Sequence, residues 1–317
     1  MNKKVVVLGG GTGLSCLLRG LKDFPVDITA IVSVCDDGKS TGRLREEFNQ
    51  VAVGDIRRVL ISLSETEPLF EELLNYRFQT SSDLNGHTVG NLLLTAMTNI
   101  TGNMNKGIKS LTRVLNLKGR VIPLTEDNSI TLMALMDDGC VVEGEHNITN
   151  YKGKIQKVYY KTEPKVSPDA IKAIKQADLI ILSMGSIYTS IVPNLICKGI
   201  RNAIDSSTAS LMYICNIVTQ PGETDDFKAS DHINLLNSYL GNKKIDVGIF
   251  NHEEMDPELV KKYETEEQKD PVILDRENLT NIKIIEDDLI TSESGTFRHD
   301  TIRLGFNIFS YLLNKRK

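Results

Sequence analysis

The chain of 317 residues contains no tryptophan, and its few cysteines show none of the spacings that bind zinc or form a disulfide framework. Cys16, Cys35, Cys140, Cys197 and Cys215 are scattered, odd in number and never part of a C-x-x-C pair. This pattern excludes zinc knuckles and disulfide-stapled folds and is typical of a reducing compartment. We therefore expect a cytoplasmic protein.

Long apolar runs and basic runs are also missing. No stretch approaches the roughly 20 apolar residues of a membrane-spanning helix. The glycines at 9–13 cut the N-terminal apolar run too short for a signal-peptide core. The formal charge is −5, and neither half of the chain carries a basic stretch. The sequence thus predicts no membrane insertion and no nucleic-acid partner, and a small molecule is the expected partner.

What the chain does contain is an alternation of strand-like and helix-like segments. Residues 5–8 and 28–34 are apolar runs of the kind found in buried parallel strands, and leucines at helical spacing lie between them. Residues 54–116 are mostly helical, residues 120–161 alternate in short segments that predict hairpins, and one helix is expected over 190–204. No repeat or linker divides the chain. The sequence predicts a single domain over 1–317, a three-layer α/β/α Rossmann-like, mostly parallel sheet with a helical segment and a β-rich insertion at 120–161.

The stretch KKVVVLGGGTGLS, at 3–15, places a bare turn between a strand and a helix. Glycines let backbone amides approach a ligand closely, and a helix N-terminus attracts phosphate. The turn matches neither common phosphate motif, because Leu14 replaces the third glycine of G-x-G-x-x-G and no P-loop lysine follows. Phosphate binding at Gly9, Gly10, Gly11, Thr12 and Gly13 and a plain strand-to-helix turn therefore both stay open.

Asp36 and Asp37 end the second expected strand, where a nicotinamide enzyme would place its ribose-binding acid. Two adjacent carboxylates followed by a long polar loop also suit Mg²⁺ ligation or general-base catalysis beside a phosphate. A charged helix cap is the third reading. If the protein is an enzyme, Asp36 and Asp37 are its candidate catalytic and metal-binding residues.

Two later loops follow buried strands and carry hydroxyl and amide groups that suit phosphate, sugar or base recognition. They span 184–190 and 219–224, and Asn194 follows the first loop. Asp55 is explained by helix capping, whereas Arg57 is either a solvated residue or a phosphate ligand. The HEEMD segment at 252–256 is not the zinc-protease motif H-E-x-x-H.

Six blocks of sequence carry a family resemblance. They are GGGTGL at 9–14, DDGKSTGRLR at 36–45, GDIRRVL at 54–60, HTVGNLLLTA at 87–96, GSIYTSIVPNL at 185–195 and CNIVTQPGET at 215–224. In this order they closely resemble the YvcK family of gluconeogenesis factors, which is related to CofD, the 2-phospho-L-lactate transferase. The sequence departs from the usual family pattern at Cys35, Lys39, Thr41 and Met184.

The resemblance implies a nucleotide diphosphate pocket. In YvcK-like members the implied ligand is a UDP-sugar and the role is support of normal cell shape during gluconeogenic growth, through a regulatory partner that the sequence does not identify. CofD-like members are Mg²⁺-dependent transferases that act on a nucleotide diphosphate adduct. A homodimer is expected by resemblance alone. Taken together, the expected ligand-binding residues are Gly9, Gly10, Gly11, Thr12, Gly13, Asp37, Ser40, Arg43, Asp55, Arg57, His87, Asn91, Gly185, Ser186, Tyr188, Thr189, Asn194, Thr219, Gln220, Gly222, Glu223 and Thr224.

Overall fold

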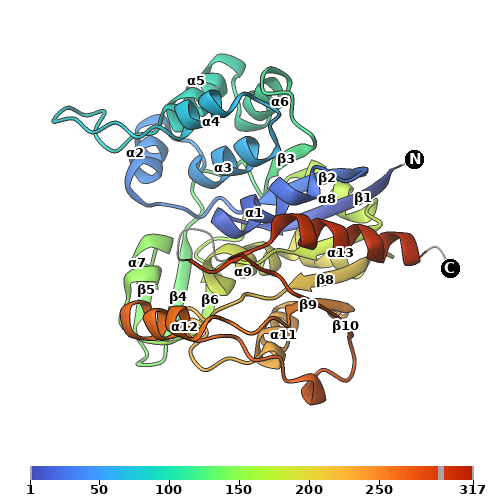
Figure 1. Ribbon diagram of the computed structural model, residues 1–317. Coiled ribbons are helices and arrows are strands. Elements are labelled where there is room, and N and C mark those ends of the chain that lie inside the picture. Colours follow the sequence, from blue (N-terminus) through green and yellow to red (C-terminus); the bar gives the residue numbers. More distant parts are fainter. Residues whose placement is uncertain (1, 292–295, 316–317) are drawn as a thin grey trace.

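A seven-stranded sheet forms the centre of the molecule in the computed structural model, which describes residues 2–291 and 296–315 (Figure 1). Its strand order is β10-β9-β8-β7-β1-β2-β3, and every neighbouring pair is parallel. The strands are β1 (Lys3–Gly9), β2 (Val26–Val32), β3 (Arg120–Pro123), β7 (Leu179–Leu182), β8 (Ser210–Ile214), β9 (Val247–Asn251) and β10 (Lys283–Asp287). The predicted Rossmann-like, mostly parallel sheet is confirmed.

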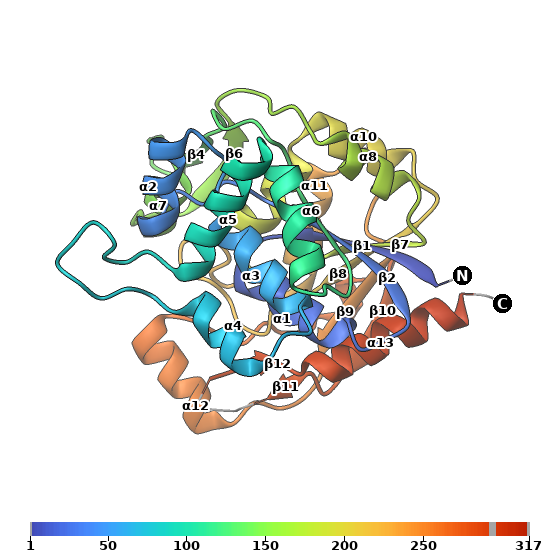
Figure 2. The ribbon, with the colours of Figure 1, turned by 90° about the horizontal axis from the view of Figure 1, so that it is seen from above.

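Helices cover both faces of this sheet, which gives the predicted three layers (Figure 2). On one face, α1 (Gly11–Leu21) packs against α3 (Gly54–Leu63) and α13 (Thr301–Asn314). On the other, α8 (Pro168–Lys175) packs against α10 (Lys198–Asp205). The α1 leucines at 14, 17, 18 and 21 are fully buried, because their helical spacing places them on the face that meets the sheet.

A group of helices is inserted between β2 and β3. It consists of α2 (Lys39–Phe48), α3, α4 (Pro68–Asn75), α5 (Val89–Thr101) and α6 (Met104–Val114). The polar loop between α4 and α5 protrudes from the body in both ribbon views (Figures 1 and 2). The helical segment expected over 54–116 is thus present, and α3 and α6 pack against β2 and β3.

The β-rich part of the chain begins later than the hairpin pattern indicated. Residues 120–123 form β3 and pair in parallel with β2 at the edge of the large sheet, because Val121 and Ile122 are buried on both faces. The antiparallel sheet of order β5-β4-β6 consists of β4 (Leu132–Met136), β5 (Val141–Glu143) and β6 (Ile155–Tyr160). The short helix α7 (Glu145–Asn150) connects β5 to β6 and lies beside the large sheet's carboxyl edge.

The helix expected over 190–204 is broken into three pieces. The chain forms a π-helical turn η1 (Ile187–Ile191), a single turn α9 (Val192–Leu195) and then α10. Pro193 lies in the first turn of α9, where its missing N–H costs no hydrogen bond. Cys197, in an extended conformation, separates α9 from α10.

The other described elements are α11 (Ala229–Tyr239), α12 (Pro257–Lys262), η2 (Tyr263–Glu267), η3 (Arg276–Asn278), β11 (Ile290–Thr291) and β12 (Arg298–His299). The amphipathic helix α13 follows them and buries Leu304, Ile308 and Leu312. In the described part of the chain, no helix has both the length and the apolar composition that crossing a membrane requires.

Candidate functional site

The strand order places the candidate site at the middle of the sheet. β1 lies between β7 and β2, so the chain leaves β1 toward one side of the sheet and returns as β7 on the other. In open α/β sheets, this reversal of strand order creates a crevice outside the carboxyl ends of the strands. The glycine turn follows β1 and the 184–190 loop follows β7, so both predicted loops border this crevice.

The glycine turn and the 184–190 loop are in direct contact. A Cβ atom on Gly13 would lie 2.1 Å from the carbonyl oxygen of Met184, so only glycine permits this packing. Gly11 has a φ of +64°, a left-handed conformation that glycine adopts without strain. The close approach of the glycine turn and the 184–190 loop therefore explains part of the glycine content of the turn. Gly10 and Gly11 also lie beside Ser190.

Asn216 holds the second loop in place. Its side-chain amide donates to the carbonyl oxygen of Gly185 at 2.9 Å and accepts from the Gly185 N–H at 2.9 Å. This two-point contact joins the residues after β8 to those after β7. Asn216 is not among the predicted site residues, although it lies within the family-like block at 215–224, shortly after β8.

The third loop, 219–224, reaches the second through Glu223. Its carboxylate accepts from the Ser186 hydroxyl at 2.7 Å and from the Gln220 side chain at 2.6 Å, and the Tyr188 N–H lies 3.3 Å away. Glu223 is 7% exposed, and burial raises its pKa to about 7. Residues 9–13, 185–190 and 219–224, which we call the rim, thus form one connected edge.

Asp55, at the start of α3, lies against the glycine turn. A Cβ on Gly10 would come within 2.8 Å of its carboxylate. Burial, together with the negative charge of Asp36, raises the pKa of Asp55 to about 6, although Arg58 at 3.1 Å opposes this shift. Asp55 is therefore more than the helix cap inferred from the sequence, because its carboxylate faces the rim.

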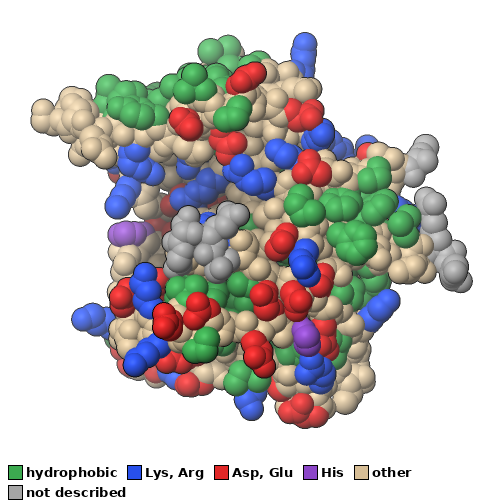
Figure 3. All heavy atoms as spheres, in the orientation of Figure 1, with side chains coloured by type: hydrophobic (Ala, Val, Ile, Leu, Met, Phe, Trp, Pro, Cys, Tyr) green, Lys and Arg blue, Asp and Glu red, His purple; other side chains and the backbone are tan. Residues whose placement is uncertain are grey.

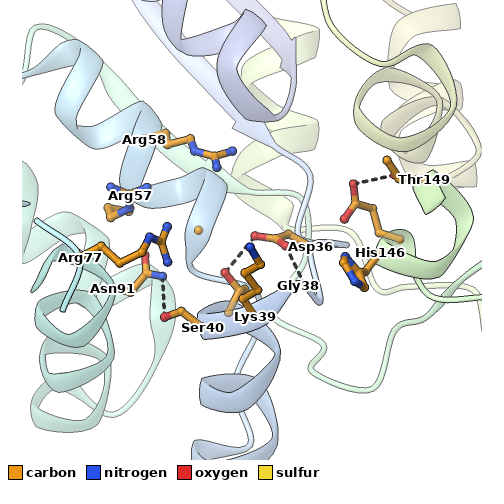
Figure 4. Close-up of a pocket in the computed structure, with 13 residues that line it drawn as sticks. Asp36, Gly38, Lys39, Ser40, Arg57, Arg58, Arg77, Asn91, His146 and Thr149 are labelled. Atoms are coloured by element: carbon orange, nitrogen blue, oxygen red, sulfur yellow. Dashed lines mark hydrogen bonds between the residues drawn. The ribbon is translucent and has the colours of Figure 1, made fainter. Parts of the chain in front are cut away.

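A polar cavity of about 280 Å³ opens beside the rim. Figure 4 shows Arg57, Arg58 and Arg77 on one side and His146 and Thr149 on the other, with Asp36 between them. Its lining residues are Asp36, Gly38, Lys39, Ser40, Thr41, Gly54, Arg57, Arg58, Arg77, Asn91, Glu145, His146 and Thr149. We call this cavity the cationic pocket. Figure 3 shows Lys and Arg side chains gathered in the indentation below α4 and α5.

Three predicted residues form a hydrogen-bonded group at the base of this pocket. The Ser40 hydroxyl lies 2.9 Å from Nδ1 of His87 and accepts from the Asn91 amide at 3.2 Å. All three side chains are buried. His87 therefore acts as a buried hydrogen-bonding partner of Ser40, and burial lowers its pKa.

Asp36 and Asp37 are adjacent in sequence but point to different places. Asp36 lines the cationic pocket, and its two oxygens accept from the Gly38 N–H at 3.0 Å and the Thr41 hydroxyl at 2.9 Å. Asp37 accepts from the N–H of His146 at 2.8 Å and lines a neighbouring cavity. Of the two carboxylates, Asp36 is the one that faces the pocket.

Glu145, on α7, is a site residue that the sequence analysis missed. It lines the cationic pocket, and its pKa is raised to about 7 by burial and by the nearby carboxylates. Arg77 and His146 were missed as well. None of them belongs to a motif, and only the packing of α7 and the α4–α5 loop against the sheet brings them here.

Several predicted residues serve the scaffold. Arg43 is exposed and donates to the backbone oxygens of Asp83 and Asn85 in the protruding loop. Asn194 is fully buried, and its amide donates to the Ser190 carbonyl at 3.0 Å, so it is not presented to the crevice. Thr219 pairs with the backbone of residue 270, and Thr224 accepts from the Gln220 N–H.

The arrangement of these carboxylates bears on metal binding. In residues 2–291 and 296–315, no three His, Cys, Asp or Glu side chains converge closely enough to hold a metal ion by themselves. Mg²⁺ commonly takes one or two carboxylates and completes its shell with waters and substrate phosphates. Asp36, with one free lone pair on each oxygen, fits that use.

An open parallel sheet with a glycine turn and polar loops at its switch point defines a Rossmann-like α/β protein with a polar cleft. The sequence profile of the family 2-phospho-L-lactate transferase CofD matches residues 5–290. The gluconeogenesis factor of Bacillus subtilis (strain 168) is 46% identical, over 94% of this chain and 94% of that protein. The gluconeogenesis factor of Halalkalibacterium halodurans is 45% identical, over 95% and 94%.

A solved structure agrees with these relatives. The crystal structure of a Bacillus halodurans protein superposes with a TM-score of 0.93 at 43% identity, covering 98% of this chain and 100% of that one. The chain therefore belongs to the CofD family, among its gluconeogenesis factors.

Proposed function

We propose that this chain is a regulatory protein that binds a UDP-sugar, with the diphosphate held at the rim. The observation that carries the proposal is the junction of three loops after β1, β7 and β8 at the switch point. The α1 N-terminus begins at Gly11 in this junction, and backbone N–H groups at a helix N-terminus favour a phosphate. The hydroxyl group of Ser190, which lies beside Gly11, supplies a further donor.

The cellular role we propose is support of normal cell shape during growth on gluconeogenic carbon sources. The relatives named gluconeogenesis factor support the metabolic part of this role. The proposal includes a cytoplasmic location, in keeping with the unpaired cysteines, and a homodimer. A deletion strain complemented with this chain and grown on a gluconeogenic carbon source would test the cellular role.

Thermal stability measured with UDP-sugars, GDP, NAD and NADP, each with and without Mg²⁺, tests the ligand. A ligand that binds only the native state stabilises it, by about 2.7 kcal/mol when the free ligand concentration is 100 times the Kd. The unfolding temperature rises as a result. We expect UDP-N-acetylglucosamine to stabilise the protein and to be recovered intact by chromatography. If only NAD or NADP stabilises it, the proposal is wrong.

Two variants of Ser190 sharpen this test. Ser190 faces Gly10 and Gly11, so Ser190→Asp would place a negative charge beside the proposed diphosphate. We expect this variant to lose the stabilisation by UDP-N-acetylglucosamine, and Ser190→Ala to keep most of it. Equal binding by both variants would place the diphosphate elsewhere.

A second candidate function is a Mg²⁺-dependent transferase acting on a nucleotide diphosphate adduct. The family match to a 2-phospho-L-lactate transferase favours it. In that case Asp36 would ligate the metal together with substrate phosphates, and the metal would neutralise charge that develops on them. Mg²⁺-dependent consumption of a donor that Asp36→Asn abolishes and Asp37→Asn preserves would support this function.

A further inference from the structure

Arg57 is a buried cation that forms no ion pair within 4 Å among the described residues, although Asp55 and Asp36 act on it from further away. Its side chain is 7% exposed, one terminal nitrogen donates to Asn75 Oδ1 at 2.5 Å, and its buried Nε has no hydrogen-bond partner among the described residues. Asn75 is neutral. The neighbouring Arg58, in contrast, pairs with Asp55 at 3.1 Å. Burying an unpaired charge is costly, so a buried guanidinium of this kind is expected where an anion completes it.

The surroundings of Arg57 add positive charge. Arg58, Arg77 and Lys39 also line the cationic pocket. Burial, together with Arg58 and Arg77, lowers the pKa of Arg57 to about 10, although Asp55 and Asp36 oppose this shift. Arg57 therefore remains charged at neutral pH. Between these cations and His146, Asp36 directs its oxygens to Gly38 and Thr41, and no ion pair joins it to Arg57 in the described part of the chain.

We propose that the cationic pocket is a second anion subsite, which binds the phosphate or carboxylate group of a small molecule other than the nucleotide. The inference rests on the proposed function, because the regulatory protein would then bind two different metabolites. A planar guanidinium with free N–H groups is suited to either group, because both accept two parallel hydrogen bonds.

The pocket and the rim are distinct. None of the residues at 9–13, 185–190 or 219–224 lines the pocket. Between them lie Asp55, which faces the glycine turn, and Glu145, which interacts with Thr149 in the pocket and with Thr189 in the rim.

The proposal also predicts an effect on the protein without ligand. Replacing Arg57 by Met keeps the length of the side chain and removes the buried, unpaired charge. If the charge is retained for a ligand, Arg57→Met should raise the unfolding temperature in the absence of anions and should lose the stabilisation that anions give. A purely structural arginine would lower the unfolding temperature when removed.

Calorimetric titration with inorganic phosphate and with malonate, at constant ionic strength set by chloride, tests the subsite directly. The wild-type chain should bind at least one of the two, and the better binder identifies the group. Arg57→Met should weaken that binding about tenfold or more, as expected for loss of a charge-assisted hydrogen bond, and Arg57→Lys should restore part of it. Arg77→Gln, at an exposed position that does not threaten folding, should weaken it by a smaller factor.

Titration of the same variants with UDP-N-acetylglucosamine separates this inference from the proposed function. We expect Arg57→Met to keep its affinity for the UDP-sugar, and Ser190→Asp to lose it while still binding phosphate or malonate. Equal losses of both ligands in Arg57→Met would mean one shared site and overturn the inference. No anion binding by the wild-type chain, or unchanged anion binding in both Arg57→Met and Arg77→Gln, would also overturn it. Failure of every nucleotide to bind would refute the proposed function alone.

Discussion

Two glycines of α1, of which only one packs against a rim loop, allow the contribution of that packing to stability and ligand binding to be measured. Gly13 and Gly20 both belong to α1, and a Cβ on either would strike a backbone carbonyl. On Gly13 it would lie 2.1 Å from the Met184 oxygen, and on Gly20 it would lie 1.9 Å from the Thr301 oxygen of α13. The perturbations are Gly13→Ala and Gly20→Ala.

The magnitude follows from these distances. Real Cβ atoms stay beyond 3.0 Å, so the carbonyls must retreat by at least 0.9 Å (3.0 − 2.1) and 1.1 Å (3.0 − 1.9). Overpacking costs about 1–3 kcal/mol, and a backbone target belongs at the upper end because no side chain can rotate away. Alanine recovers about 1 kcal/mol of helix propensity over glycine. We expect a net loss of about 2 kcal/mol for each variant.

Urea unfolding and calorimetric titration with UDP-N-acetylglucosamine complete the comparison. Both variants should lose similar stability, but only Gly13→Ala moves Met184 and with it the 185–190 loop. Gly20 lies seven residues further along α1, about 10 Å away at 1.5 Å per residue, so Gly20→Ala should keep its affinity. A Gly13→Ala protein as stable as wild type would refute the packing argument, and equal losses of affinity would refute its assignment to the rim.

Two further predictions concern the residues that hold the rim together. Asn216→Ala removes both hydrogen bonds to Gly185 and should lower the free energy of unfolding, measured by urea denaturation, by about 1–3 kcal/mol. A change below about 0.5 kcal/mol, the range of an ordinary surface substitution, would contradict this prediction. Glu223 has a pKa raised from 4.5 to about 7, so its charged form is disfavoured in the folded state. Between these values the folded state binds more protons than the unfolded state, and the stability of wild type relative to Glu223→Gln should fall as pH rises, by up to about 1.4 kcal/mol per unit. His232 and His299, with pKa values lowered to about 4 by burial, act in the opposite direction, but both are present in the two proteins and cancel in the difference; parallel pH profiles would contradict the prediction.

The parts of the fold that the sequence predicts are those with local signals. The runs at 5–8 and 28–34 are apolar because parallel strands are buried on both faces, and they became β1 and β2. Loops that follow such strands must meet at one edge of the sheet, so the junction of the rim loops could be anticipated. Segment 120–123 was misjudged because a short edge strand of a parallel sheet and one arm of a hairpin have the same composition.

The composition of the cationic pocket could not be predicted in the same way. Glu145 lies on α7 and Arg77 follows α4. Both are far from the glycine turn in sequence, and no periodicity marks them. Asp36 and Asp37 carry identical side chains, and only the backbone after β2 decides that the first faces the pocket and the second faces α7. Tertiary packing, rather than local pattern, assigns these residues.

The raised pKa values of Asp55 and Glu145 explain how two proposed anion sites, the rim and the cationic pocket, can lie beside acidic side chains. Asp55 and Glu145 have pKa values raised to about 6 and about 7, and in both cases burial is the largest cause and Asp36 contributes. Near neutral pH they therefore carry less negative charge than free carboxylates would. An anion on either side raises these pKa values further, because it disfavours the charged forms. Protonation would in turn reduce the repulsion that a second anion meets. Asp55 and Glu145 would therefore separate the two ligands sterically, while their protonation lowers the electrostatic cost of binding both.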